Sequence, residues 1–145
     1  MATASRSRSV SASQQDVWAL IADADHMPRW WPGVARVEGV SEDHFTQVFK
    51  TKKGRSVRLD FQVIESEAPW RRSWQQEITG TPFERVLNQS IISVELKPAG
   101  TRTEVTLSHE QRLRGYSRTG GFMLKRATRG KLDEALDGLE RLFGP

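Results

Sequence analysis

The sequence contains no cysteine among its 145 residues. It therefore has no disulfide framework and no thiolate chemistry, and it suits a reducing compartment. It also lacks any run of about 18 consecutive apolar residues, the length that a transmembrane helix requires. The polar segment 1–9 has no apolar core of the kind found in signal peptides. These absences lead us to expect a cytoplasmic chain with no transmembrane segment.

Charge of one sign is present in only slight excess, with 22 Lys and Arg residues against 18 Asp and Glu residues. An excess this small does not indicate specific nucleic-acid binding. The sequence has only three histidines, and neither they nor the carboxylates show the spacing of metal ligands. We therefore expect no metal and no cofactor. The length suits one domain over residues 1–145.

Hydrophobic periodicity divides the chain into recognisable elements. Residues 7–12 have the pattern of a short strand, and a capping box at Ser13 predicts a helix over residues 14–24. Pro28 and Pro32 bracket a second short helical turn. Period-two alternation then predicts six strands, at 34–39, 45–49, 57–63, 70–78, 84–97 and 102–113. After a glycine-containing loop, an apolar stripe predicts a helix over residues 121–143.

This order of elements predicts an α+β fold. The strands are joined by short connections, which favour antiparallel pairing. A sheet must cover its apolar face, and the chain offers only one long helix for that purpose. We therefore expect a curved seven-stranded antiparallel sheet around the long C-terminal helix, with two short helices after the first strand.

Four segments resemble the START and birch-pollen-allergen superfamily of helix-grip proteins (SRPBCC), especially its bacterial polyketide cyclase/dehydrase group. They are 16–21 (DVWALI), 23–38, 98–105 (PAGTRTEV) and 131–136 (KLDEAL), and the resemblance extends over nearly the whole chain. It implies the helix-grip fold with an internal cavity for a lipophilic molecule. Because the superfamily contains carriers, aromatase/cyclases and co-chaperone domains, it does not fix the function.

The last hairpin places polar side chains on the predicted inner face. If Pro98 and Thr101 flank the turn, Val94 pairs with Val105 and Ser90 pairs with His109. The same register pairs Asn88 with Gln111. A few directional groups on an apolar wall would orient a lipophilic ligand, whereas the alternative is that these side chains only satisfy one another. His109 is a weak catalytic candidate, because no third residue is placed to orient it.

The predicted ligand-binding residues share the inner face of the sheet or the inner stripe of the helix. They are Phe61, Arg72, Trp74, Asn88, Ser90, His109, Gln111, Leu124, Thr128 and Leu132.

A basic stretch near the start of the long helix is the main charge feature. Alternate connections of a meander lie at one end, so the turn around Lys52 is expected beside the loop that follows residue 113. The predicted basic rim consists of Lys52, Lys53, Arg55, Arg114, Arg118 and Lys125. It would recognise an anionic ligand group, an acidic carrier protein or an anionic membrane surface, and the alternative is an ordinary solvated surface.

Three functions remain open on the sequence. The first is a binding or carrier protein for a hydrophobic small molecule such as a lipid, a polyketide or an isoprenoid. The second is an aromatase/cyclase or dehydratase that acts on a polyketide-type substrate, with cavity shape steering the reaction. The third is an interaction module that docks through its basic face. The absence of a clear acid–base constellation favours the first.

Overall fold

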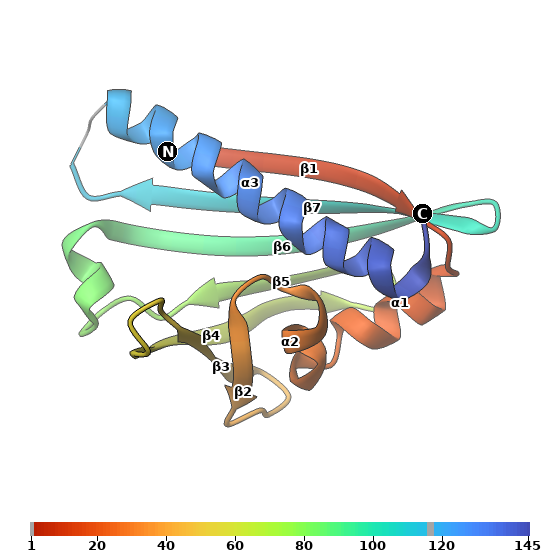
Figure 1. The fold of residues 1–145 in the computed structure, drawn as a ribbon, viewed down its shortest axis with the longest axis horizontal. Coiled ribbons are helices and arrows are strands. Elements are labelled where there is room, and N and C mark those ends of the chain that lie inside the picture. Colours follow the sequence, from red (N-terminus) through yellow and green to blue (C-terminus); the bar gives the residue numbers. More distant parts are fainter. Residues whose placement is uncertain (1, 116–117) are drawn as a thin grey trace.

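The computed structural model describes residues 2–115 and 118–145, with the backbone alone for 118 and 119 (Figure 1). Seven strands, three α-helices and two short 3-10 helices follow one another along the chain. In order they are β1 (Ala2–Val10), α1 (Gln14–Ile21), η1 (Ala24–His26), α2 (Met27–Trp30), β2 (Val34–Glu38), β3 (His44–Lys50), β4 (Ser56–Glu67), β5 (Arg71–Gln76), η2 (Pro82–Arg85), β6 (Leu87–Ala99), β7 (Arg102–Leu113) and α3 (Arg118–Phe143).

The strands form one antiparallel sheet in the order β1-β7-β6-β5-β4-β3-β2. Figure 1 shows α3 running across this sheet, with α1 and α2 beside its C-terminal half. The predicted fold class is therefore confirmed, including the two short helices after the first strand. None of the described helices is long and apolar enough to cross a membrane.

The start of α1 follows the capping rule that the sequence indicates. The Ser13 hydroxyl accepts a hydrogen bond from the Asp16 amide at 3.1 Å, which satisfies one free donor of the first turn. Val17 and Ile21 are fully buried one turn apart, so α1 closes one end of the core. The side-chain amide of Gln14 donates to the Leu96 carbonyl at 3.2 Å and ties this helix to β6.

Helix α3 is fixed firmly at its C-terminal half. Leu132, Leu136 and Leu139 are completely buried in the core. Gly138 lies against α2 so closely that a Cβ there would be 2.5 Å from the Trp30 carbonyl oxygen. Only glycine permits this approach of helix to backbone.

Ion pairs and hydrogen bonds attach the same half of α3 to β1 and β7. Arg6 pairs with Asp133 at 3.4 Å, and Arg8 pairs with both Asp137 and Glu140. Beyond the helix, the Arg102 guanidinium donates to the Pro145 carbonyl at 2.7 Å.

The β6–β7 register differs from the predicted one by two residues. Ala99 pairs with Arg102, so Gly100 and Thr101 form the turn, and His109 is opposite Ile92 rather than Ser90. The physical reason is the turn. Gly100 has φ +67° and is the first of the two central residues, the place where a type II′ hairpin requires glycine. The sequence-based register put Gly100 second. A shift of two residues preserves the face of every side chain.

Three local departures change what the chain exposes. Residues 82–85 form a 3-10 helix instead of the start of β6, because Pro82 lacks the amide that a strand ladder needs. A bulge between Leu87 and Gln89 then breaks the register, and Asn88 is exposed. Trp70, predicted to share the inner face of β5, precedes that strand and is 53% exposed.

Candidate functional site

Polar side chains occupy the inner face where β6 and β7 run beneath the first half of α3. Ser90 pairs with Gln111 across the two strands, and His109 is the next inward residue along β7. The Ser90 Oγ is 2.7 Å from the His109 Nε2. Residues diagonal to each other on a strand pair are within reach of a ring of this size. The hydroxyl and the imidazole therefore satisfy one another.

A second polar pair joins the sheet to the helix. The Thr128 hydroxyl donates to Oε1 of Gln111 at 3.0 Å, and both side chains are buried. Because Gln111 also pairs with Ser90 in the ladder, the two polar pairs adjoin. Together Ser90, His109, Gln111 and Thr128 form what we call the inner polar cluster.

His109 is uncharged at neutral pH. Burial lowers its pKa from 6.5 to about 4, and the positive charge of Lys131 acts in the same direction. The neutral ring offers one N–H donor and one acceptor nitrogen. In the described part of the chain His109 bonds to Ser90 and to no carboxylate. The inner polar cluster is therefore a neutral group of donors and acceptors.

The neighbouring wall is aromatic. Phe45 and Phe61 stack with ring centroids 5.3 Å apart, and Trp74 meets Phe45 edge-on at 6.2 Å. Trp31 also meets Trp74 edge-on, with ring centroids 6.4 Å apart. Trp74 is completely buried, and its indole Nε1 has no hydrogen-bond partner among the described residues. An apolar wall beside a small neutral polar cluster suits an amphipathic small molecule.

The predicted ligand-binding residues separate into three groups. Ser90, His109, Gln111 and Thr128 are brought together by hydrogen bonds. Phe61, Trp74 and Leu132 belong to the same buried core, and Leu124 is only partly buried.

Arg72 and Asn88 lie apart from the cluster. Arg72 pairs with Val94, in the row of inward-facing residues next to the row that contains His109. Its guanidinium donates to the Ser66 hydroxyl at 2.8 Å. Burial lowers the pKa of Arg72. Asn88 lies in a surface hollow of about 290 Å³ that is also lined by Gln62 and Gln75. The bulge at Leu87 explains why Asn88 leaves the inner face.

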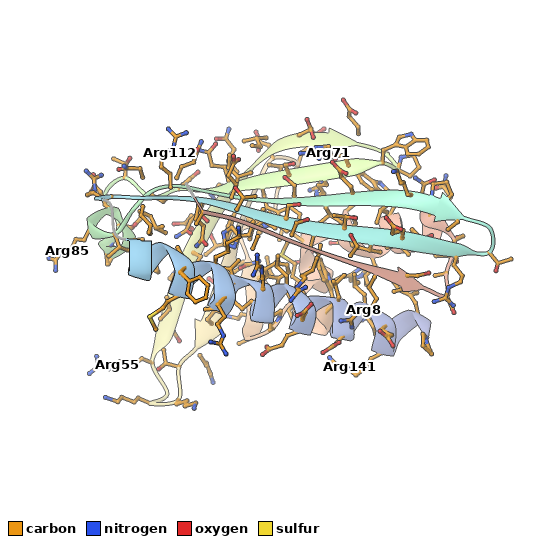
Figure 2. All side chains as sticks on the ribbon, turned by 90° about the horizontal axis from the view of Figure 1, so that it is seen from above. Arg8, Arg55, Arg71, Arg85, Arg112 and Arg141 are labelled. Atoms are coloured by element: carbon orange, nitrogen blue, oxygen red, sulfur yellow. The ribbon has the colours of Figure 1, made fainter. Side chains whose placement is uncertain are left out.

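The structure describes most of the side chains of the predicted basic rim. Lys52, Lys53 and Arg55 are exposed in the β3–β4 turn, whereas Lys125 is partly buried on α3. Arg114 donates from Nε to the Glu84 carbonyl at 2.7 Å and so fixes the segment before β6. The side chain of Arg118 lies outside the described residues. In Figure 2, Arg55 lies at the same end of the molecule as the start of α3.

Two further residues adjoin the inner polar cluster and were not among the predicted site residues. Lys131 extends from α3 until its Nζ is 5.9 Å from the centroid of the Phe49 ring, and its charge reaches His109. Gln76 is buried and pairs with Phe61 of β4. The β5–β6 pairing ends at Gln75 and Ile91, and continuing it by one residue places Gln76 opposite Ser90. The sequence does carry a signal for Gln76, because it alternates with Trp74 on the inner face.

No metal centre is apparent in the described part of the chain, which contains no group of three potential metal-binding side chains.

Comparisons with solved structures agree with this architecture. The chain resembles a START superfamily protein from Mycobacterium smegmatis, with a TM-score of 0.78, 13% identity and coverage of 99% of this chain and 97% of that one. It also resembles the Aha1 dimer protein of Colwellia psychrerythraea, with a TM-score of 0.72, 19% identity and coverage of 99% and 97%. At these identities the likeness establishes the fold alone.

A third similar structure is the di-domain ARO/CYC protein BexL from the BE-7585A biosynthetic pathway. The TM-score is 0.80 at 23% identity, and the match covers 97% of this chain but 46% of BexL. A search of curated proteins finds no significant match. The family model described as polyketide cyclase / dehydrase and lipid transport matches residues 1–144. The chain is therefore a member of that family and has the START-like SRPBCC fold that the sequence resemblance implies.

Proposed function

We propose that the chain binds a lipophilic small molecule, of the size of a lipid, polyketide or isoprenoid, between the concave face of the sheet and the first half of α3. The observation that carries this proposal is the inner polar cluster on an otherwise apolar wall. His109 is only partly buried although it faces inward, which supports space beside it. In this role the protein is a carrier or binding protein and performs no chemistry on its ligand.

The chemistry of the cluster favours a ligand with a neutral polar group at its inner end. Neutral His109 and the hydroxyls of Ser90 and Thr128 can each exchange their internal hydrogen bond for one to a ligand carbonyl or hydroxyl. A charged group placed there would lose its hydration without a counter-ion. An anionic end would instead suit the basic rim or Lys131, where water remains.

The family description and the START-like neighbours support hydrophobic-ligand binding as a class. Four more specific expectations remain predictions. They are an anionic ligand group, an acidic carrier protein, a cytoplasmic location and a single ligand-binding domain over residues 1–145.

A second candidate is an aromatase/cyclase or dehydratase. Two observations favour it: the likeness to BexL, whose description names that activity, and the contact of a neutral imidazole with the Ser90 hydroxyl. A neutral imidazole is a competent general base near neutral pH. Against this, no carboxylate in the described residues orients His109, and an imidazole with a pKa of about 4 is a weak base.

The direct test is native mass spectrometry of the purified full-length chain, followed by identification of any co-purified lipophile. The binding of that molecule is then measured for His109→Ala and Ser90→Ala. We expect each variant to weaken affinity about twofold to tenfold, the range for one hydrogen bond. His44→Ala is the matched control, because His44 lies on the same sheet and pairs with Glu77.

Two results would count against the carrier proposal. One is equal affinity for the His109, Ser90 and His44 variants, which would place the ligand elsewhere. The other is a turnover that His109→Ala reduces by orders of magnitude with binding intact, which would favour the enzyme.

A further inference from the structure

Charge is segregated along α3. The half that precedes Leu132 carries cations without a single acid, and the half that follows it carries the acids. The cations with described side chains are Lys125, Arg126, Arg129 and Lys131, and the acids are Asp133, Glu134, Asp137 and Glu140.

The two halves differ in what their charges contact. Asp133 pairs with Arg6, and both Asp137 and Glu140 pair with Arg8, so the acidic half is attached to β1. Within the described part of the chain, the cations of the first half take part in none of the ion pairs. Their charge is therefore available to a partner.

This arrangement is unfavourable for the isolated helix. The helix dipole favours acids in the first turn and bases in the last turn. The first turn of α3 has no acid, whereas its last turn has Arg141. Arg126 and Arg129 are three residues apart, and Lys125 and Arg129 are four apart, so like charges are neighbours on the helix surface. The stability of the fold does not account for this choice of residues.

Large apolar side chains accompany the unpaired cations. Phe122 is 66% exposed and Met123 is 64% exposed, both in the first turns of α3. Phe122 and Arg126 are four residues apart and share a helix face. An outward helix surface that combines bulky apolar and basic side chains is typical of segments that lie in a membrane interface.

Other elements add to the same end of the molecule. Figure 2 shows Arg55, Arg85 and Arg112 toward the end where α3 begins, with Arg112 above the sheet and Arg55 below it, whereas Arg8 and Arg141 lie toward the opposite end. Val86, next to Arg85, is 55% exposed. The basic end, as we call it, consists of Arg55, Arg85, Val86, Arg112, Phe122, Met123, Lys125, Arg126 and Arg129.

We propose that the basic end docks the protein on an anionic lipid bilayer, with Phe122 and Met123 entering the headgroup region. The cations come from four separate elements, β7, α3, the β3–β4 turn and η2, which suits a broad, uniformly charged plane. A specific protein partner requires a patch that matches it in both charge and shape. The bulky apolar side chains can insert among lipid headgroups, and an acidic polymer does not offer them such a contact.

The proposal does not depend on what the inner polar cluster binds. It does place the bilayer beside the half of α3 that covers that cluster, because Thr128 follows Arg126 by two residues and bonds to Gln111. A lipophile that enters or leaves past this half of α3 would do so at the lipid surface.

The test is co-sedimentation of the full-length chain with vesicles. Equimolar phosphatidylglycerol and phosphatidylcholine are compared with phosphatidylcholine alone. We expect binding to the anionic vesicles only, and its loss when ionic strength rises from about 0.1 M to about 1 M, where the Debye length falls from about 10 Å to about 3 Å. Arg126→Glu/Arg129→Glu should weaken binding more than about tenfold. Phe122→Ser/Met123→Ser should also weaken it on the same vesicles.

The matched control is Arg29→Glu/Arg141→Glu, which changes net charge equally at the other end of the chain's long helix. Both residues are exposed. Circular dichroism and thermal unfolding show whether each variant is folded, and Arg126→Glu/Arg129→Glu should change stability little, since both side chains are exposed.

Three outcomes would overturn the proposal. The first is no binding to anionic vesicles by the wild type. The second is an equal loss for the two charge-reversal variants, which would indicate net charge alone. The third is full binding by the folded Phe122→Ser/Met123→Ser variant, which would mean that Phe122 and Met123 do not enter the headgroup region and that charge alone binds the vesicles.

Discussion

The Ser90 hydroxyl and the His109 imidazole are in contact at 2.7 Å, although Ser90 pairs with Gln111 and His109 pairs with Ile92. The contact runs diagonally between strands, where a long or aromatic side chain reaches the neighbour of its partner. It leaves His109 bonded without a counter-ion, which is why burial lowers its pKa. Its protonation should therefore be coupled to folding.

We predict that the free energy of unfolding decreases as the pH falls from about 6.5 to about 4, the window between the ordinary pKa of His109 and its native value. Between these two pH values the unfolded chain binds a proton at His109 and the native state does not. The contribution of His109 to the free energy of unfolding is therefore complete above about pH 6.5 and is lost as the pH falls toward about 4. The loss is on the order of 3 kcal/mol. Urea unfolding of wild type and His109→Gln, at about pH 7.5 and about pH 4.5, measures it. Carboxylates titrate alike in both proteins, so an identical pH dependence would show that His109 is not responsible.

Two glycines of α3 should respond oppositely to alanine. A Cβ on Gly138 would be 2.5 Å from a backbone oxygen of Trp30, which cannot move aside as a side chain tip can. We expect Gly138→Ala to destabilise the protein by about 1–3 kcal/mol. Gly130 has nothing among the described residues within 4 Å of that position, so Gly130→Ala should stabilise by about 0.5–1 kcal/mol. Thermal unfolding of the two variants measures both stability changes. A stabilising effect of Gly138→Ala would contradict the close approach of α2 and α3.

The Thr128–Gln111 hydrogen bond should show strong non-additivity. Thr128→Val removes the hydroxyl and leaves the buried Oε1 of Gln111 without that donor, at a cost of about 1–3 kcal/mol. Adding Gln111→Met removes the unsatisfied group and should recover much of the loss. A double-mutant cycle in urea measures the coupling. Strictly additive effects would mean that water already replaces this bond.

Much of the fold follows from the sequence because the period of apolar residues is a strong local signal. Alternation over Val57, Leu59 and Phe61 identifies β4, and the capping box identifies the start of α1. The faces of Ser90, His109 and Gln111 are also correct, since face depends only on whether a position is odd or even.

What the sequence does not reveal depends on single-residue geometry. The place of Gly100 within its turn sets the β6–β7 register, and the bulge at Leu87 removes Asn88 from the inner face. Neither leaves a periodic pattern. Lys131 was missed for a different reason. Its contact with the Phe49 ring and the effect of its charge on the pKa of His109 depend on how α3 crosses the sheet, which no local pattern specifies.

Helix α3 is attached more firmly at its C-terminal half than at its N-terminal half, like a rod clamped at one end. Its last turns are clamped by the Arg6 and Arg8 ion pairs and by the backbone contact at Gly138, while Thr128 is bonded to the sheet nearer the other end. Displacement of a clamped rod grows with distance from the clamp, so we expect larger fluctuations over the inner polar cluster than over Leu136 and Leu139. Opening there leaves Leu136 and Leu139 packed, and it therefore requires far less free energy than global unfolding. If a ligand enters as proposed, access to the interior and resistance to denaturation depend on opposite halves of one helix, and we expect each to change by mutation without the other.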